Sequence, residues 1–211
     1  MGEKPKKNED TIKTWNDIFP EKWEMDKAKR IFKESNIRNN IDKKLLAVTQ
    51  DEGIIFKSDS SKNYVSPSGD LSGLKLVKTD DYVISLRSFE GGIETSEIEG
   101  IVSPAYNVFY LDKDLKCVEL QKYYQYLFKT PQFIKLLNTL VTSIRDGKNI
   151  SFNDFSEVPL PRPKPEQVRF LLKYFEIYEK AKKHFSEAEK YLSEYKTTLI
   201  NSAVTGKIKV S

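Results

Sequence analysis

The sequence has almost none of the residues on which metal centres and nucleophilic active sites are most often built. Among its 211 residues are one cysteine, Cys117, and one histidine, His184. A single cysteine cannot form an intramolecular disulfide, and these counts also exclude a Cys/His zinc cluster. His184 lies among lysines in a charged helical stretch, where we do not expect it to activate a nucleophile. Disulfide scaffolds and Cys/His metal sites are therefore excluded.

Glycine-rich phosphate loops are missing as well. Neither Gly-x-x-x-x-Gly-Lys-Ser/Thr nor Gly-x-Gly-x-x-Gly occurs, and the lone pair Gly91-Gly92 predicts only a turn. Asp42-Lys43-Lys44 has a spacing found in metal-dependent nucleases, but a magnesium site needs more than one placed carboxylate. These features indicate a binding protein without catalytic or metal-ligating residues.

Long apolar runs are also missing. The uncharged run Ile101–Leu111 has 11 residues, whereas about 20 are needed to cross a bilayer. Residues 1–16 are polar and charged, with no apolar stretch of the kind found in signal peptides, and we expect a flexible tail there. Together with the single cysteine, this predicts a cytoplasmic protein without membrane association.

The pattern between residues 17 and 164 is that of a mixed α+β domain. Hydrophobic residues make up 38% of the chain and aromatic residues 12%, enough for one globular core. Short runs rich in Val, Ile and aromatic residues alternate with turn signals and helical periodicity. The predicted strands are Lys44–Thr49, Ile54–Lys57, Tyr82–Leu86 and Val108–Leu111, and the predicted helices are Lys122–Phe128 and Gln132–Ser143.

The pattern changes at Val158–Pro165, where four prolines in alternate positions predict an extended spacer. Neither Gly nor Pro then occurs until Gly206. Within this stretch, apolar residues follow a 3-4 spacing over four heptads, which predicts a long coiled-coil helix over 165–205 and a short tail over 206–211. The residues of this seam are Leu171, Tyr174, Tyr178, Ala181, Phe185, Ala188, Leu192, Tyr195 and Leu199.

Two interpretations of this helix are open. It could pack on its own domain as an ordinary amphipathic helix, or it could pair with another helix. A domain of about 150 residues has a radius of gyration of about 15 Å, so the helix is long enough to outreach it. This favours pairing with a second copy or a related half-subunit, and the Ala and Tyr residues of the seam suit a close antiparallel partner.

Three polar segments are candidates for DNA contact. The net charge of +4 permits a nucleic-acid partner without requiring one, but Lys22–Lys44 holds eight basic residues against four acidic ones. Lysine can neutralise phosphates, whereas arginine and asparagine can read base edges. Each segment also fits an ordinary solvated surface. The candidate residues are Arg38, Asn39 and Asn40 in the first segment, Arg87 and Ser88 in the second, and Arg145, Lys148 and Asn149 in the third.

Several stretches together resemble one protein family. Tyr82–Glu94 and Gly100–Val108 resemble a region common in target-recognition domains of type I restriction-modification specificity subunits. Asn149–Pro161, followed by Pro165-Glu166-Gln167, resembles the junction that leads into the conserved helix of this family, and Tyr195–Ile208 is similar to the end of that helix. The resemblance covers roughly residues 80–208. Residues 1–80 match loosely, through Pro20-Glu-Lys-Trp23.

The resemblance implies a recognition subunit for double-stranded DNA, without catalytic residues of its own. In this family S-adenosylmethionine is held by partner methyltransferase subunits, and the restriction subunit is a separate chain. Family members hold two recognition domains and two long helices, whereas this chain has one of each. It therefore resembles a half-subunit, two of which would read a target of two half-sites.

Two alternatives remain open. Ser103-Pro-Ala-Tyr106 resembles the Ser/Asn/Asp-Pro-Pro-Tyr motif of amino methyltransferases, although Ala105 replaces the second proline. The chain could thus be a small S-adenosylmethionine-dependent DNA base methyltransferase, unless these residues form a turn before the next strand. It could also be a coiled-coil interaction module that does not bind DNA.

Overall fold

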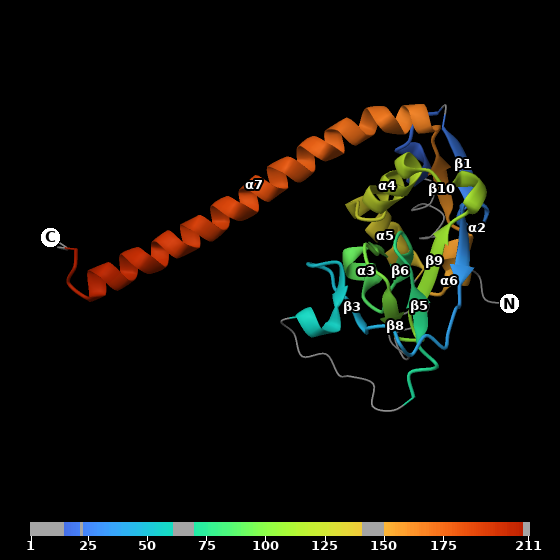
Figure 1. Ribbon diagram of the computed structural model, residues 1–211. Coiled ribbons are helices and arrows are strands. Elements are labelled where there is room, and N and C mark those ends of the chain that lie inside the picture. Colours follow the sequence, from blue (N-terminus) through green and yellow to red (C-terminus); the bar gives the residue numbers. More distant parts are fainter. Residues whose placement is uncertain (1–14, 22, 61–69, 141–149, 209–211) are drawn as a thin grey trace. The chain divides into compact units, whose positions relative to one another are not determined.

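The computed structural model describes residues 15–21, 23–60, 70–140 and 150–208, and the chain divides into two compact units after Pro165 (Figure 1). The first unit combines short helices with antiparallel strands, and the second consists of one long helix and its end. A mixed α+β fold followed by a long C-terminal helix confirms the fold class predicted from the sequence.

A four-stranded antiparallel sheet lies at the centre of the first unit, in the order β2-β9-β6-β7. Its register pairs Phe32 with Leu111 and Tyr82 with Phe109. Strands β6 and β9 confirm two of the strands predicted from the sequence. The bounds are β2 Phe32–Ser35, β6 Tyr82–Ile84, β7 Glu94–Thr95 and β9 Asn107–Leu111.

Three two-stranded antiparallel sheets complete the strand structure described for this unit, pairing β1 with β10, β3 with β4, and β5 with β8. Strands β3 and β4 were predicted, whereas β1, β5, β8 and β10 were not. The bounds are β1 Glu24–Lys27, β3 Leu46–Val48, β4 Ile54–Phe56, β5 Lys75–Val77, β8 Gly100–Val102 and β10 Pro159–Arg162.

Strand β10 corrects the prediction of an extended spacer at Val158–Pro165. The segment is extended, but it pairs with β1, with Pro159 opposite Lys27 and Pro161 opposite Met25. Proline has no N–H to donate, so a strand tolerates it where its nitrogen faces an edge that is not hydrogen-bonded to a neighbouring strand. The alternate spacing places all the missing donors on the same edge, which lets the other edge pair.

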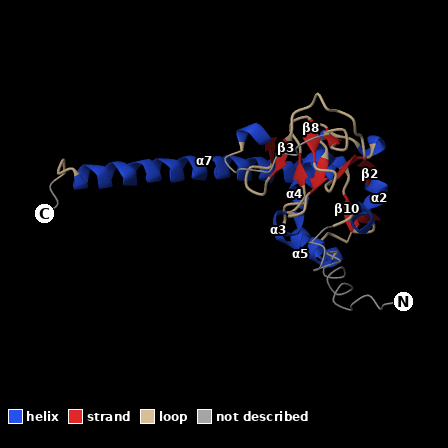
Figure 2. Ribbon diagram, turned by 90° about the horizontal axis from the view of Figure 1, so that it is seen from below, coloured by secondary structure: helices blue, strands red, loops and turns tan. Residues whose placement is uncertain are grey.

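Short helices cover the sheet, and their residue ranges confirm the two predicted helices as α4 and α5 (Figure 2, helices in blue). Helix α5 begins one residue before the predicted start at Gln132: Pro131 occupies the first turn, and the Thr130 hydroxyl accepts a hydrogen bond from the Phe133 N–H at 3.3 Å. The bounds are α2 Ala28–Ile31, α3 Ser88–Gly91, α4 Val118–Leu127, α5 Pro131–Thr139 and α6 Phe152–Ser156, with 3-10 turns η1 Lys57–Asp59 and η2 Lys113–Leu115.

The core of the first unit is built from aromatic rings. Phe32 lies at its centre, with ring centroids 5.0 Å from Tyr124 and 5.3 Å from both Tyr82 and Phe109. The phenols of Tyr82 and Tyr124 are hydrogen-bonded, because the Tyr82 hydroxyl donates to the Gln121 carbonyl at 3.0 Å and the Tyr124 hydroxyl donates to a β10 carbonyl at 2.9 Å. The rings therefore join the sheet to α4 and to β10.

Trp15 belongs to this folded unit, although its position falls within the tail predicted over residues 1–16. Its side chain is buried, and its indole N–H donates to the Pro159 carbonyl at 2.7 Å. The ring also contacts Phe133, at a centroid distance of 5.7 Å. The folded unit thus includes Trp15.

All but the first residue of helix α7, Pro165–Val204, belongs to the second unit, and its 40 residues confirm the predicted long helix. It ends as the sequence predicts, because Gly206 has a φ of 70° and donates to the Ala203 carbonyl, while Lys207 donates to the Ser202 carbonyl. This pair of bonds is a Schellman end. No helix among the described residues is long and apolar enough to cross a membrane.

Candidate nucleic-acid interface

Three of the loops that carry polar candidates leave the same end of the central sheet. Strand β2 ends at Ser35, β6 ends at Ile84 and β9 begins at Asn107. The register pairs Ser35 with Val108 and Ile84 with Asn107, which brings these three strand ends together. The segments 36–40, 85–91 and 103–106 therefore project from one sheet end, which we call the loop end.

The first of these segments holds Arg38, Asn39 and Asn40 in a fixed conformation. The Arg38 guanidinium donates to the Asn36 side chain at 3.0 Å and to the Gly73 carbonyl at 3.2 Å. Asn39 has a φ of 61°, a left-handed conformation that asparagine tolerates, and the Asn40 amide donates to the Arg38 carbonyl at 2.8 Å. Arg38 is exposed and has no carboxylate partner among the described residues, so its charge remains available to a ligand.

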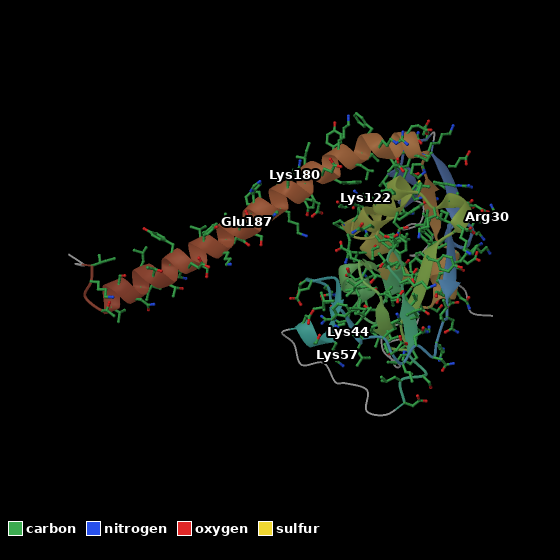
Figure 3. The ribbon with its side chains drawn as sticks, in the orientation of Figure 1. Arg30, Lys44, Lys57, Lys122, Lys180 and Glu187 are labelled. Atoms are coloured by element: carbon green, nitrogen blue, oxygen red, sulfur yellow. The ribbon has the colours of Figure 1, made fainter. Side chains whose placement is uncertain are left out.

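Most other cations of this basic segment are already paired with carboxylates. Lys27 and Lys29 both donate to Glu157, and these hydrogen bonds lower the pKa of that carboxyl to about 2. Three more cations of this segment are paired: Arg30 with Asp26, Lys33 with Asp112, and Lys43 with both Glu99 and Asp42. Lys44, which is labelled in Figure 3, differs, because its ammonium lies 4.9 Å from the centre of the Phe56 ring. The excess of lysine and arginine in the sequence therefore overstates the positive surface here.

The second segment presents Arg87 and buries Ser88. Arg87 is exposed, and its Nε and Nη2 donate to Glu90 Oε2 at 3.0 and 2.6 Å. Gln50, from the β3–β4 turn, donates to the same carboxylate oxygen at 3.0 Å. Ser88 is 1% exposed, and its hydroxyl accepts the Ser85 N–H at 2.9 Å. Ser88 thus shapes the loop and does not face solvent.

The loop of Arg87 is anchored to the corner between α4 and α5. Lys129 donates to the Gly91 carbonyl at 3.1 Å and forms an ion pair with buried Glu94. The Asn138 amide donates to the Phe89 carbonyl at 2.7 Å. Gly92 has a φ of 82°, and a Cβ at this position would lie 2.1 Å from a main-chain oxygen of the corner, so only glycine fits. Gly91 is the last residue of α3 and Gly92 is its C-cap, so the predicted turn is instead the end of a one-turn helix.

The third segment, with Arg145, Lys148 and Asn149, lies outside the described residues. Its neighbour Ile150 is described, and the Ile150 carbonyl accepts a hydrogen bond from the Asn107 amide at 2.9 Å. Because Asn107 begins β9, the chain re-enters the described structure at the loop end.

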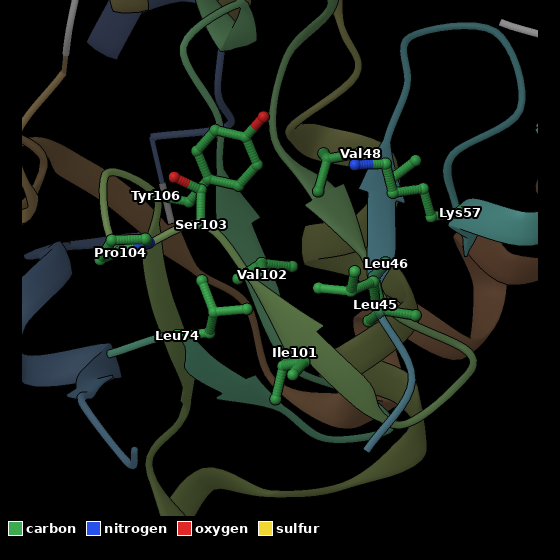
Figure 4. A pocket seen from close by; sticks show the side chains of 11 residues that line it. Leu45, Leu46, Val48, Lys57, Leu74, Ile101, Val102, Ser103, Pro104 and Tyr106 are labelled. Atoms are coloured by element: carbon green, nitrogen blue, oxygen red, sulfur yellow. The ribbon is translucent and has the colours of Figure 1, made fainter. Parts of the chain in front are cut away.

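Ser103–Tyr106 forms the turn between β8 and β9, in which the Tyr106 N–H donates to the Ser103 carbonyl at 3.1 Å. Beside it lies a pocket of about 320 Å³, lined mainly by aliphatic side chains of β3 and β8 (Figure 4). The Lys75 ammonium donates to the Tyr106 carbonyl at 2.7 Å, and burial lowers the pKa of this lysine. Ser103–Tyr106 is thus a packed turn, which is the interpretation that the sequence offered beside a methyltransferase motif.

Two residues that hydrogen-bond to the loop end, Gln50 and Lys75, were not predicted from the sequence. Gln50 lies in a turn of the β3–β4 hairpin and gives no periodic signal. Lys75 is part of a three-residue strand whose side chains are all buried, where a lysine contradicts the usual pattern. Neither residue is conspicuous until the fold places it beside the predicted candidates.

The seam of α7 is exposed from Tyr174 onward, and Leu171 is partly buried. Every residue from 176 to 201 is exposed, including Phe185 at 73% and Leu192 at 67%. Ile177 and Tyr191, also exposed, widen the predicted stripe along one side, because they lie one position before Tyr178 and Leu192. The labelled Lys180 and Glu187 project from the polar side of the same helix (Figure 3). An apolar stripe of this length is the surface with which helices pair.

No protein-family model and no curated protein matches the chain. Among solved structures, a chain from a study of complex assembly and conformational transition of the type I R-M system matches with a TM-score of 0.52 and 15% identity, over 93% of this chain and 52% of that chain. The chain shares that fold. The HsdS subunit from Thermoanaerobacter tengcongensis gives a TM-score of 0.48 and 14% identity, over 95% of this chain and 52% of that one. The chain thus spans about half the length of the structures it matches.

Proposed function

We propose that this chain recognises a specific sequence of double-stranded DNA as a specificity half-subunit of a type I restriction-modification system. The observation that carries the proposal is the loop end, where segments far apart in the sequence bring Arg38, Asn39 and Arg87 to one sheet end. Loops on a rigid scaffold commonly carry binding residues. Arginine and asparagine supply the donors and acceptors that read base edges.

The fold supports the same proposal. The structure from a type I R-M system with which this chain shares its fold is about twice as long, and this chain matches 52% of it. One α+β unit and one long helix would thus correspond to half of a specificity subunit. In the proposed complex this chain carries no catalytic residue, and partner methyltransferase subunits hold S-adenosylmethionine. Restriction subunits would join the same complex.

Helix α7 would complete the unit by pairing with a second copy or a related half-subunit. At 1.5 Å per residue its 40 residues span about 60 Å. An antiparallel pair would place two recognition domains at opposite ends of the paired helices. Two identical halves would then read matching half-sites in inverted order, because the symmetry of the protein is mirrored in its DNA site.

Duplex binding by the purified full-length chain tests the proposal. We expect enrichment of a defined motif from a pool of randomised duplexes, and an affinity that falls steeply as the salt concentration rises, because bound cations release counterions from DNA. A methyltransferase would instead bind S-adenosylmethionine by itself, which calorimetry measures directly. Salt-insensitive or absent duplex binding, with association through α7 intact, would favour the interaction module.

A further inference from the structure

Arg87, Glu90 and Gln50 form a hydrogen-bonded cluster that leaves two N–H donors of the Arg87 guanidinium unused among the described residues. Nε–H and one Nη2–H of Arg87 point at Glu90 Oε2, which uses the lateral edge of the guanidinium. Nη1 of Arg87 has no hydrogen-bond partner in the described part of the chain. The distal edge, with one N–H from Nη1 and one from Nη2, is therefore left to a ligand. Arg87 is 68% exposed, so this edge is open to one.

Two further contacts hold the cluster in place. The Gln50 amide donates to Glu90 Oε2 at 3.0 Å and to the Arg87 carbonyl at 3.3 Å. Gly91 lets Gln50 approach, because a Cβ at Gly91 would lie 2.7 Å from the Gln50 side chain. The loop is also anchored to the α4–α5 corner through Lys129. A guanidinium fixed in advance loses less side-chain entropy when it binds.

Two parallel donors require two acceptors that lie side by side. In the major groove, guanine presents N7 and O6 in this arrangement, whereas adenine offers one acceptor and one donor. A phosphate could also accept both donors. The Glu90 carboxylate argues against a phosphate, because Oε2 lies 2.6 Å from Nη2 and offsets the positive charge that a phosphate would need. A base edge has no net charge, so the nearby carboxylate does not repel it as it would a phosphate.

We propose that Arg87 reads a guanine in the DNA target, and that Glu90 and Gln50 are positioning residues that hold its guanidinium for this contact. The inference rests on the proposed function, and it adds the identity of one base and the residue that selects it. Glu90 acts through Arg87 and does not itself touch the base.

The test is motif selection from randomised duplexes by four full-length proteins: the parent chain, Arg87→Lys, Glu90→Ala and Arg30→Lys. Arg87→Lys keeps the positive charge but removes the two parallel N–H donors of the guanidinium. Discrimination at one guanine should therefore fall roughly 5- to 150-fold while the rest of the motif is retained. Arg30 is a matched control, because it is a 72% exposed arginine paired with Asp26 and belongs to α2, at the other end of β2. Arg30→Lys should select the motif of the parent chain.

Glu90→Ala separates positioning from a merely structural role. Without its carboxylate partner Arg87 becomes a free cation, so preference for the guanine should weaken while binding to random duplex strengthens and becomes more salt-dependent. A loss of folding would instead weaken both, and tryptophan fluorescence checks folding in each variant.

The outcomes distinguish the two proposals. If the parent chain selects a motif and Arg87→Lys selects the same motif with equal preference at every position, Arg87 reads no base. The inference about Arg87 is then wrong, whereas the proposed function stands. If the lost preference lies at a base pair without guanine, the assignment of the base is wrong. If the parent chain enriches no motif, the proposed function fails and the inference falls with it.

Discussion

Phenylalanine has opposite environments in the two units of this chain. Phe32 in the first unit is 1% exposed and lies among other rings, whereas Phe185 on α7 is 73% exposed. The first unit therefore has a buried aromatic core of its own. Helix α7 exposes an apolar stripe along its length, and such stripes mark association sites. Stability is concentrated in one region and the capacity for assembly in the other.

The largest effect should come from Phe32→Ala. Removing a fully buried ring from a packed core costs about 3–5 kcal/mol, because contacts are lost and a cavity remains. Urea unfolding followed by tryptophan fluorescence measures it, since both tryptophans, Trp15 and Trp23, belong to the first unit. Phe185→Ala is the control and should leave this transition unchanged. Equal destabilisation by both substitutions would contradict the comparison between the two regions.

The second prediction concerns α7. Phe185→Asp would place a carboxylate in the middle of each paired seam and should weaken self-association by about 2–4 kcal/mol, roughly 30- to 1000-fold in the dissociation constant. Analytical ultracentrifugation over a concentration series measures it. Thr197→Asp adds the same charge to the polar side of the helix and should associate like the parent chain. A parent chain that stays monomeric well above micromolar concentration would rule out a homodimer and leave pairing with a related half-subunit.

The third prediction concerns Asp81, whose pKa burial raises to about 6. Because this pKa is higher in the folded than in the unfolded state, the stabilising contribution of protonated Asp81 is full below about pH 4 and is lost as the pH rises through 6. Asp81→Asn does not titrate and can still accept the Lys78 N–H, which lies 2.8 Å from the native carboxylate. Its stability relative to the parent chain should therefore rise between pH 4 and pH 8, by about 2–3 kcal/mol.

Urea unfolding of both proteins at several pH values measures this difference. Asp42→Asn provides the control, because the Asp42 side chain is 75% exposed and should show no such trend. A constant difference between Asp81→Asn and the parent chain across the series would mean that Asp81 titrates normally.

The smallest effect is expected from Arg38→Ala. Arg38 has no carboxylate partner among the described residues, so its loss should lower duplex affinity by about 1–3 kcal/mol, with a salt slope smaller by about 1 if it binds a phosphate. Fluorescence anisotropy with labelled duplex over a salt series measures both values. Arg30→Ala removes an arginine already paired with Asp26 and should change neither. Equal losses from both variants would mean that net charge alone governs binding.

Local sequence patterns predicted much of the fold. The periodicity of α5, the run of Val, Ile and aromatic residues in β6 and the heptad seam of α7 are properties of neighbouring residues, and the structure confirms each element. Strands β1, β5 and β10 escaped prediction, because three or four residues carry too little periodicity, and prolines in β10 suggest a spacer. Pairing between residues 24–27 and 159–162 depends on partners more than 130 positions apart.

The candidate site shows the same division. Arg38, Asn39 and Arg87 could be selected from the sequence because arginine and asparagine near turns suit base recognition. The carboxylate partners of Lys27, Lys29 and Lys33 could not be foreseen, because Glu157 and Asp112 come from distant elements. Composition counts charges, but it does not show which of them neutralise one another.

The sequence by itself determined the residue types available for binding, the break near Pro165 and the length and seam of α7, because helix periodicity and proline effects act over a few residues. Only the tertiary structure decided that the Arg38 and Arg87 loops share one sheet end, that Ser88 faces inward and that Glu90 and Gln50 hold Arg87. These relations follow from strand register and from the packing of distant segments. Hydrogen bonds and close packing act between neighbours in space, and the order of residues along the chain does not state which residues will become neighbours.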